Sequence, residues 1–433
     1  MTSPKTRSFL AGFALTAICA AGPATARDAD VAALEARVAE LEALVQQLIE
    51  AQADAQPEAE PAPAPVAEQT DADAVPMHSY KFGGYVKFDS LTSWYSDGDL
   101  APGSPGTQFY IPATIPVGDA PSSGPDTDFQ ARATRINFTS NHNLDSGAEI
   151  KTLVEFDFFL SPGGNERVSN SYNPRLRHAY FTYNNWLFGQ NWSTFQDVGA
   201  LPEAVDFIGP SESTTFIRQP QVRYTSGAWE FAVENPETTI TPFGGGSRIV
   251  TDDGPWPDLV GRYTAQLDNG YIKAAALLRQ LNYEAGGVKD EELAYGVSVS
   301  GKHNFGQDDL RWMATVGTGV GRYLGLNTSN GAVLDAEGKL EAIDQWGAFA
   351  SFRHFWSDQW RSNFILGYLS IDNDTALTGT GVTSDVYSVH ANLLYSPVPK
   401  MTVGAELMFA EREVESGDQG DMTRFLLSAK YIF

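Results

Sequence analysis

Arginine residues alternate with apolar residues in several short stretches of this sequence. Arg135 precedes Ile136. Arg175 and Arg177 flank Leu176. A guanidinium group holds a carboxylate by paired, charge-assisted hydrogen bonds and stays charged at any working pH. If these stretches are β-strands, each arginine lies on a polar face, where a small anion could bind. The same pattern recurs at Arg223 and Arg262.

The role of these cations depends on how many of them are neutralised. Guanidinium groups in excess over nearby carboxylates would select anions, as rings of cations do in anion pores. Guanidinium groups matched one to one would only brace a wall. The sequence leaves both roles open. The candidate carboxylate partners are Glu155, Asp157, Glu230 and Glu234, and the second-choice cations are Lys87, Arg132, Lys151, Arg218, Arg279 and Arg353.

Other kinds of chemistry find little support in the sequence. Residues 317–321 match part of a dinucleotide-binding fingerprint, but they lie in a strand-rich region with no following helix. The six histidines show no metal-ligand spacing. No Ser-His-Asp triad or pair of catalytic carboxylates can be picked out. We therefore predict no catalytic residue, no cofactor and no metal site.

The N-terminal region has the features of a secretion signal over residues 1–26. Lys5 and Arg7 precede an apolar run, and small residues at 24–26 form a cleavage site. Cleavage would remove Cys19, the single cysteine, and with it any thiol chemistry. No later stretch has the roughly 18 to 20 consecutive apolar residues that a membrane helix needs. The formal net charge of −25 over 433 residues argues against a nucleic-acid partner.

Residues 27–50 follow with a heptad repeat of apolar residues. A helix this short needs partner helices to bury its seam, and the pattern suits a coiled coil of two or three strands. An amphipathic helix on a membrane surface is the alternative, which the acidic polar face disfavours. Residues 51–76, rich in Pro, Ala and Glu, are expected to form a solvated linker. The seam consists of Val31, Leu34, Val38, Leu41, Val45 and Leu48.

From residue 77 to residue 433 the sequence changes to short alternating stretches. Val154 and Phe156 alternate with Glu155 and Asp157, which produces one apolar face and one polar face. Soluble β-sandwiches alternate in the same way. Aromatic residues near strand ends, and a change between short and long connections, favour a transmembrane β-barrel instead. The aromatic residues are Tyr183, Trp186, Trp192, Trp229, Trp346, Trp356 and Trp360.

The last alternating stretch also favours a barrel of the bacterial outer membrane. Tyr431 and Phe433 share its apolar face, and a terminal strand ending in Phe resembles the signal that the barrel-assembly machinery reads. At about 20 to 24 residues per strand and connection, residues 77–433 hold roughly 15 to 18 strands. Because such barrels have even strand numbers, we expect an all-β antiparallel barrel of about 16 strands, wide enough for an aqueous channel.

One polar segment, residues 196–215, could narrow such a channel. It carries Asp197, Glu203, Asp206 and Glu212. Folded into the barrel, the segment would set these carboxylates opposite the arginines and create a transverse field. An ordinary external loop is the alternative.

Five short stretches occur along the chain in an order that is more specific than any one of them: residues 82–89 (FGGYVKFD), 174–180 (PRLRHAY), 189–195 (GQNWSTF), 218–224 (RQPQVRY) and 396–399 (SPVP). Together they resemble the DcaP-type trimeric porins. The resemblance implies an outer-membrane homotrimer with a periplasmic coiled coil, in contact with lipid and lipopolysaccharide. It also implies passive passage of small anionic solutes, dicarboxylates above all, without catalysis.

Two other functions stay open. A phosphate-type channel would show a dense lysine cluster at one level, whereas the strand lysines of this sequence are scattered. An envelope tether would act through the coil and linker, residues 27–76, with the barrel as its anchor. Deletion of those residues distinguishes a tether from a channel.

Overall fold

The computed structural model describes residues 78–161, 163–167, 169–251 and 254–433. The expected secretion signal, coiled coil and linker of residues 1–76 lie outside the described residues. Over the part of the chain that is described, no helix is long and apolar enough to cross a membrane.

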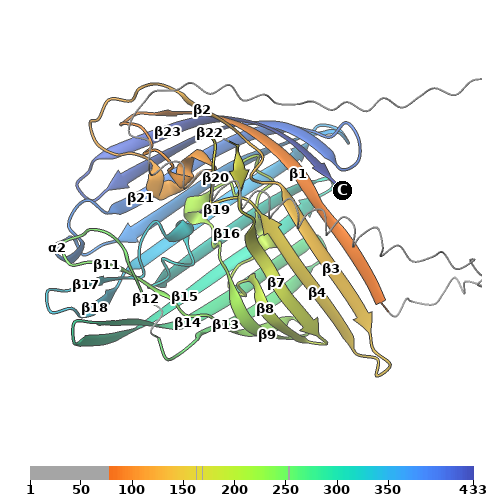
Figure 1. Ribbon diagram of the computed structural model, residues 1–433, viewed down its shortest axis with the longest axis horizontal. Helices are drawn as coiled ribbons and strands as arrows, with labels where there is room; N and C mark the ends of the chain where they lie inside the picture. Colours follow the sequence, from red (N-terminus) through yellow and green to blue (C-terminus); the bar gives the residue numbers. More distant parts are fainter. Residues whose placement is uncertain (1–77, 162, 168, 252–253) are drawn as a thin grey trace, which may run out of the picture. The chain divides into compact units, whose positions relative to one another are not determined.

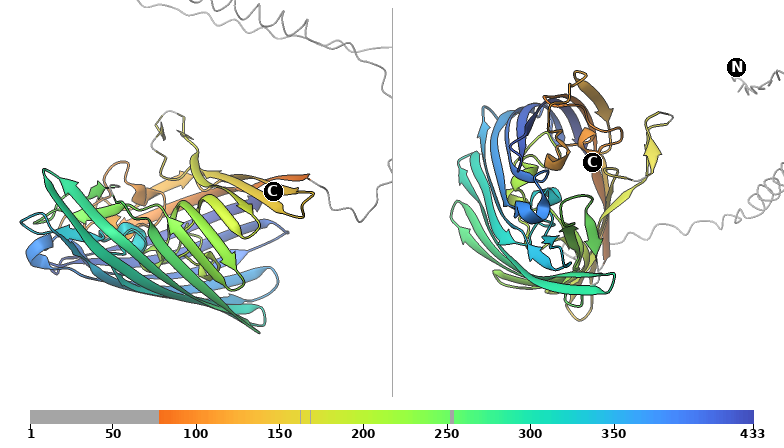
Figure 2. Two further views of the ribbon diagram at one scale, coloured as in Figure 1. Left: turned by 90° about the horizontal axis from the view of Figure 1, so that it is seen from below. Right: turned by 90° about the vertical axis from the view of Figure 1, so that its left-hand side faces the viewer.

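Sixteen strands of the described residues form one closed antiparallel ring (Figure 1; Figure 2). The last strand, β23, returns to pair with β1 from Tyr85↔Ile432 to Tyr95↔Met422. The predicted all-β barrel and its strand number are therefore confirmed. The ring consists of β1 (His78–Tyr95), β3 (Arg135–Asn143), β4 (Glu149–Asp157), β7 (Arg175–Tyr183), β8 (Trp186–Trp192), β9 (Arg218–Ser226), β10 (Trp229–Glu234), β13 (Asp258–Leu267), β14 (Gly270–Ala285), β15 (Val288–Phe305), β16 (Asp308–Thr318), β19 (Asp344–Phe355), β20 (Trp360–Asp372), β21 (Thr383–Tyr395), β22 (Met401–Val414) and β23 (Gln419–Ile432).

Strand β1 changes partners along its length. Its first half pairs with β3 up to Tyr85↔Arg135, and its second half pairs with β2 (Asp126–Gln130), which is a seventeenth strand of the sheet. Gly84 permits the close approach of β1 to β3. Its φ is +146°, and a Cβ there would lie 2.1 Å from the carbonyl oxygen of Arg135. The glycine of the β1 motif thus positions the backbone of a predicted site residue.

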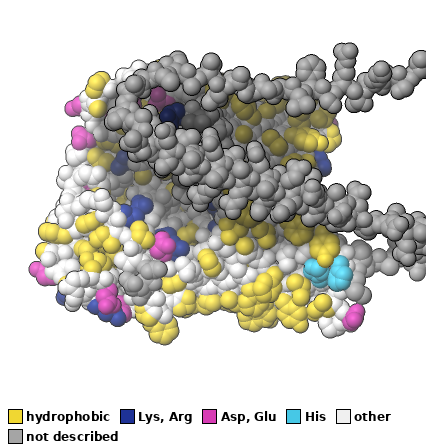
Figure 3. Space-filling model, viewed as in Figure 1, with side chains coloured by type: hydrophobic (Ala, Val, Ile, Leu, Met, Phe, Trp, Pro, Cys, Tyr) yellow, Lys and Arg dark blue, Asp and Glu magenta, His cyan; other side chains and the backbone are white. Residues whose placement is uncertain are grey.

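The outward face of the strands is apolar, as the alternation predicted. On β20, Phe364, Leu366 and Tyr368 are 53%, 59% and 37% exposed, whereas Ile365 and Leu369 are fully buried. Apolar side chains cover much of the barrel surface visible in Figure 3. The inward face is less polar than we expected, because loop segments inside the ring pack against residues such as Leu369.

The turns at one rim of the barrel are all short, and the long connections lie at the other rim. Turns of two residues join β7 to β8, β9 to β10 and β13 to β14. The longest connections run over residues 96–125, 193–217 and 319–343. This asymmetry is typical of outer-membrane barrels, in which the short turns face the periplasm.

The long connections carry further short elements. A four-stranded sheet joins two of the connections and packs on Leu281 and Ala294 of the β14–β15 hairpin. A hairpin of β5 and β6, in the connection between β4 and β7, projects from the wall (Figure 2). These elements are β5 (Gly164–Asn165), β6 (Ser171–Tyr172), β11 (Thr238–Thr241), β12 (Ile249–Thr251), β17 (Ala332–Leu334), β18 (Leu340–Ala342), α2 (Thr375–Thr378) and the 3-10 turns η1 (Pro105–Thr107), η2 (Pro112–Thr114), η3 (Val198–Ala200), η4 (Ser211–Ser213) and η5 (Gly325–Asn327).

Aromatic side chains lie on the outer face near both rims. Trp186 and Trp229 flank short turns and are 43% and 49% exposed, and Trp346 lies near the opposite end, 46% exposed. Such belts suit the two membrane interfaces. Trp192 departs from this prediction: β8 ends there, the chain turns into the barrel, and the indole ring contacts Arg177 on the inside.

Candidate functional site

Residues 193–217, between β8 and β9, fold into the barrel. Their turns η3 and η4 contact the inner sides of β15, β16, β19, β20 and β21. Arg311 Nη1 donates to the carbonyl oxygen of Leu201 at 2.6 Å, and Lys87 Nζ donates to that of Val205 at 2.8 Å. Of the two alternatives that the sequence left open, the structure therefore shows the one in which the segment lies inside the barrel (Figure 2).

Two carboxylates of this segment are fastened to cations of the barrel wall. Asp197 accepts a hydrogen bond from Lys273 Nζ at 2.7 Å. Glu203 accepts hydrogen bonds from Arg353 at 3.2 Å and from Arg361 at 2.9 Å. Burial alone would raise the pKa of Glu203, but the two arginines outweigh burial and lower the pKa below its usual value.

Two further carboxylates of the segment are buried. Asp206 accepts a hydrogen bond from the main-chain NH of Tyr110 at 3.0 Å, and Glu212 accepts one from Ser388 Oγ at 2.8 Å. Burial raises the pKa of both carboxyl groups. Both groups therefore act as anchors of the segment rather than as open charges.

The wall contributes another buried carboxylate to the attachment, Glu406 of β22. It accepts hydrogen bonds from the main-chain NH of Val205 at 2.7 Å and from Asn392 Nδ2 at 3.0 Å, and His390 Nδ1 lies 3.2 Å away. Glu406 and His390 are each 1% exposed. These contacts tie residues 193–217 to β22.

The segment places its carboxylates only partly as we expected. Within the described residues, Arg135, Arg175 and Arg177 form ion pairs with carboxylates of β4, not with those of residues 196–215. The expected opposition between this segment and the wall arginines therefore occurs at Arg353 and Arg361, which hold Glu203, but not at Arg135, Arg175 and Arg177. The reason is that a carboxylate folded into the barrel needs nearby donors, and the wall on which the segment packs supplies them.

Four of the predicted cations come together where β3, β7 and β9 begin. Arg177 donates from Nε to Glu155 and from Nη1 to Asp157, both at 2.8 Å. Arg175 Nη2 donates to Asp157 at 2.7 Å, and Arg135 Nε lies 3.5 Å from Glu155. Three guanidinium groups thus share two carboxylates, and Arg218 lies beside them. We call Arg135, Arg175, Arg177 and Arg218 the arginine cluster.

Arg218 is the member of the arginine cluster for which no carboxylate partner occurs within ion-pair distance in the described residues. Its guanidinium carbon lies 4.6 Å from the ring centroid of Trp192 and 5.9 Å from that of Phe216. Contact with aromatic faces stabilises a cation without neutralising it. The cluster therefore carries an excess of positive charge.

A β-bulge positions the centre of the arginine cluster. The register between β4 and β7 shifts between Glu155 and Phe156. As a result Arg177 and His178, which are consecutive in the sequence, are both buried, with 1% and 4% exposure. Strict alternation would have turned one of the two outward.

A second, smaller group of cations lies on β9 and β13. Arg223 Nη1 lies 3.5 Å from Glu230, and Arg262 Nε donates to the same carboxylate at 2.7 Å. Glu234, an expected partner, instead accepts a hydrogen bond from the main-chain NH of Thr194 at 2.7 Å. Two guanidinium groups therefore share one carboxylate.

The barrel architecture agrees with the comparison to known proteins. A model of the family described as DcaP outer membrane protein matches residues 20–433. The chain belongs to the DcaP outer membrane protein family. This match confirms the resemblance that the sequence motifs indicated. No curated protein matches the chain.

Solved structures show the same fold. The outer membrane channel DcaP of Acinetobacter baumannii is 22% identical, with a TM-score of 0.67 over 82% of this chain and 97% of that chain. A loop-deletion mutant of OmpT of Vibrio cholerae is 12% identical, with a TM-score of 0.51 over 83% and 100%. OmpF of Salmonella typhi is 11% identical, with a TM-score of 0.51 over 82% and 97%.

Two other predicted cations of this DcaP-family barrel are matched by single carboxylates. Lys87 Nζ lies 3.0 Å from Asp89. Arg279 Nε donates to Asp258 at 3.3 Å. These pairs fit the bracing role better than the selecting role.

Two more predicted cations lie apart from the arginine cluster. Lys151 lies near the short-turn rim, and its side chain is 56% exposed. Arg132 contacts Glu166 and Tyr172 of the projecting connection. Because Phe129, which lines the same depression, is 64% exposed on the outer face, Arg132 belongs to the outside of the barrel.

The sequence pattern missed a third basic group, on β16, β19 and β20. Arg311 and Arg353 both contact Asp309, and Arg353 shares Glu203 with Arg361. Arg353 was only a second choice, and the other two arginines were not singled out. Their alternation with outward-facing residues was the available signal, but it does not show that the strands become neighbours.

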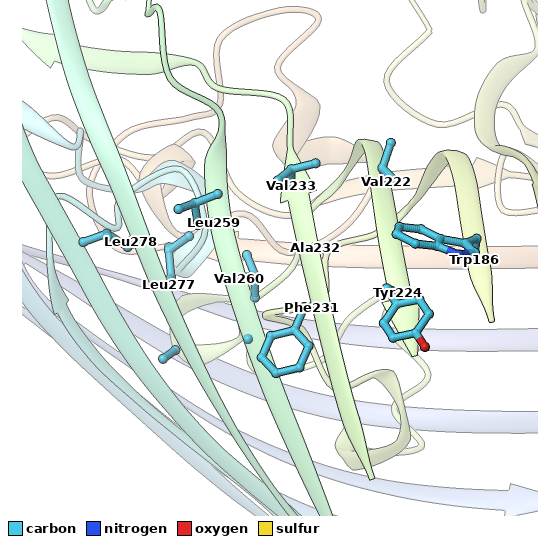
Figure 4. Close-up of a pocket in the computed structure, with 12 residues that line it drawn as sticks. Trp186, Val222, Tyr224, Phe231, Ala232, Val233, Leu259, Val260, Leu277 and Leu278 are labelled. Atoms are coloured by element: carbon cyan, nitrogen blue, oxygen red, sulfur yellow. The ribbon is translucent and has the colours of Figure 1, made fainter. Parts of the chain in front are cut away.

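An apolar depression lies on the outer face of β10, β13 and β14 (Figure 4). Phe231, Leu259 and Leu278, which line it, are 52%, 46% and 46% exposed. None of its lining residues is charged. The depression therefore suits hydrocarbon, and the chemistry of a polar solute belongs to the lumen of this family member.

Proposed function

We propose that this chain is an outer-membrane channel for passive diffusion of small hydrophilic solutes, with a preference for anions of the dicarboxylate type. The arginine cluster carries this proposal, because three of its four guanidinium groups share only Glu155 and Asp157 and Arg218 pairs with neither. The donors that these two carboxylates leave unused can bind a solute carboxylate. The pair of Arg223 and Arg262, which shares one carboxylate, extends the positive field.

The narrowing of the lumen supports selection by these cations. Residues 193–217 occupy part of the barrel interior and are held there by buried hydrogen bonds. A solute confined beside the wall interacts with charges over a few ångströms, where screening by salt is weak. The description of the Acinetobacter baumannii relative as an outer membrane channel also supports this function.

We also propose that the functional unit is a homotrimer. Strands β8 and β10 have 7 and 6 residues, whereas β14 and β15 have 16 and 18. A strand that crosses lipid needs about 9 to 11 residues. The part of the wall that contains the short strands β8 and β10 is therefore suited to contact with neighbouring subunits. One form of the related OmpT of Vibrio cholerae, 11% identical with a TM-score of 0.50, is described as a trimer.

An outer-membrane trimer would have three further kinds of contact: between its coiled coils, with lipid, and with the barrel-assembly machinery. The heptad seam of residues 27–50 would lie in the periplasm and join three chains. The outer wall would contact lipid and lipopolysaccharide. Tyr431 and Phe433, at the end of the strand that closes the ring, would be read by the barrel-assembly machinery during insertion.

Single-channel recording with Arg218→Gln tests the proposed selectivity. The wild-type protein should show anion preference in a salt gradient and block by succinate. Arg218→Gln removes the charge that lacks a carboxylate partner, so the anion-to-cation permeability ratio should fall by about fivefold, since a unit charge a few ångströms from an ion in water contributes about 1 kcal/mol. Reversal potentials in planar bilayers measure this ratio.

Lys151→Gln is the matched control for Arg218→Gln. Lys151 is exposed and already paired with Glu149 at 2.8 Å, so its loss should leave the permeability ratio nearly unchanged. Cation preference in the wild-type channel, or equal shifts in the two variants, would contradict selection by the arginine cluster.

A further inference from the structure

Two histidines lie side by side at the short-turn rim. His78 of β1 and His142 of β3 are cross-strand partners, and their ring centroids are 4.9 Å apart. Their Nδ1 atoms are 2.9 Å apart. His78 is exposed and His142 is partly exposed, and Figure 3 shows histidine side chains together on the surface at this edge of the barrel. The pair is therefore open to solvent.

The second ring nitrogen of His142 favours one tautomer. Its Nε2 lies 3.0 Å from Ser140 Oγ, which in turn lies 2.7 Å from Thr152 Oγ1. With the Nε2 proton donated to Ser140, the Nδ1 atom of His142 directs a lone pair toward His78. Histidines that bind metals are commonly oriented by such a hydrogen bond from the remote nitrogen.

The spacing of the two Nδ1 atoms suits one coordination geometry. An imidazole nitrogen binds a first-row divalent metal at about 2.0 to 2.1 Å. Two such nitrogens 2.9 Å apart would subtend an angle of about 90° at the metal. A right angle fits the tetragonal sites of Cu²⁺ and Ni²⁺, whereas tetrahedral Zn²⁺ requires a wider separation.

We propose that His78 and His142 form a bidentate site for a divalent transition-metal ion, Cu²⁺ or Ni²⁺ in preference to Zn²⁺, with water in the remaining positions. On metal binding, the proton that His78 Nδ1 donates to His142 would move to His78 Nε2, so that both imidazoles stay neutral and coordinate through Nδ1. The site ties the first strand of the barrel to its neighbour β3. It lies at the rim rather than among the lumen arginines, so it is independent of the proposed solute preference.

Titration of the purified protein with Cu²⁺ in detergent at neutral pH tests this site. We expect one ion per chain, with an electron paramagnetic resonance spectrum that shows coupling to two nitrogens. His142→Ala leaves a single ligand, and the loss of chelation should weaken binding by about 100-fold. Calorimetry measures the affinity.

His303→Ala is the matched control for His142→Ala. His303 also lies near the short-turn rim, where its ring stacks on Trp312, and its loss should leave Cu²⁺ affinity unchanged. Equal affinity in wild type and His142→Ala would overturn the proposal. So would the absence of binding in wild type up to about 1 mM Cu²⁺, a concentration that detects even weak complexes.

Ni²⁺ provides a second readout that does not depend on the spectrum. An ion that binds only the folded barrel raises its unfolding temperature. Saturating Ni²⁺ should therefore raise this temperature in wild type and in His303→Ala but not in His142→Ala. Heat-modifiable mobility on gels shows whether each variant has folded, and an equal rise in folded His142→Ala would overturn the site.

Discussion

At the scale of the residue, the side chains of the lumen divide between bracing and selection. Arg175 and Arg177 both hold Asp157, which is fully buried, and such pairs stabilise the wall because either partner alone would be a buried charge. Arg218 instead rests on aromatic rings. We therefore propose that the paired guanidinium groups brace the wall and that the excess charge of the cluster selects anions.

Glu203 makes the attachment of residues 193–217 dependent on pH. Its pKa is lowered in the folded protein, so its ionised form stabilises the fold above the ordinary value of 4.5, and this contribution is lost as pH falls through the lower folded value. Asp206 and Glu212 act in the opposite direction. Burial raises their pKa values, so protonation at low pH removes a buried charge and favours the folded state. A loosened segment should make the single-channel current fluctuate. In the wild type, this current noise should therefore increase only below about pH 4.5.

Glu203→Gln should show this noise already at pH 7, because the amide cannot hold Arg353 and Arg361 as a carboxylate does. Single-channel recording between pH 7 and pH 3 measures the effect. Glu341→Gln, an exposed carboxyl group on β18, is the control. A channel of Glu203→Gln as quiet as wild type at pH 7 would show that this carboxylate does not hold the segment.

At the scale of the element, irregularities in the strands place the functional side chains. The bulge beside Glu155 buries both Arg177 and His178. At Gly84, the backbone of β1 lies close to that of Arg135. Regular alternation would predict neither arrangement. These departures from a uniform sheet lie where the arginine cluster forms, as is common for bulges near functional sites.

Gly84→Ala should destabilise the barrel by about 1 to 3 kcal/mol, because it places a Cβ against the backbone of Arg135 in a conformation that L residues rarely adopt. A lower urea midpoint of unfolding measures the change. Gly381→Ala, with no atom within 4 Å of the added Cβ, should leave the midpoint unchanged. Equal midpoints for the two variants would mean that β1 shifts to accommodate the methyl group.

At the scale of the whole molecule, the barrel is a closed wall with a partly filled interior. Phe195 and Val320, from two different connections, join wall residues such as Leu369 in one apolar core. A barrel of 16 strands would otherwise leave a wide aqueous channel. The conductance of each pore is therefore expected to depend on these connections and not on residues outside the barrel.

Deletion of residues 27–76 should leave the conductance of each pore unchanged and weaken the trimer on native gels, since it removes the heptad seam. Leu34→Ser combined with Leu41→Ser breaks the seam but keeps the linker, and it should weaken the trimer to the same extent. An intact trimer with weakened attachment of the outer membrane would instead favour the envelope tether.

The sequence by itself determined the class of the barrel, its strand number and its family resemblance. A period of two residues is a local property, and the strand number follows from the length of residues 77–433 divided by the length of one strand and its connection. The inward positions of Arg135, Arg175 and Arg223 also followed from this local alternation.

Only the tertiary structure decided which ionisable side chains come into contact. His78 and His142 become neighbours through the register of two strands, although 64 positions separate them in the chain. Asp197 and Glu203 turned toward β14 and β20 rather than toward the arginine cluster, because each folded carboxylate had to find donors on the wall beside it. Pairing across strands and the neutralisation of buried charge depend on the closed barrel, which no local pattern of residues encodes.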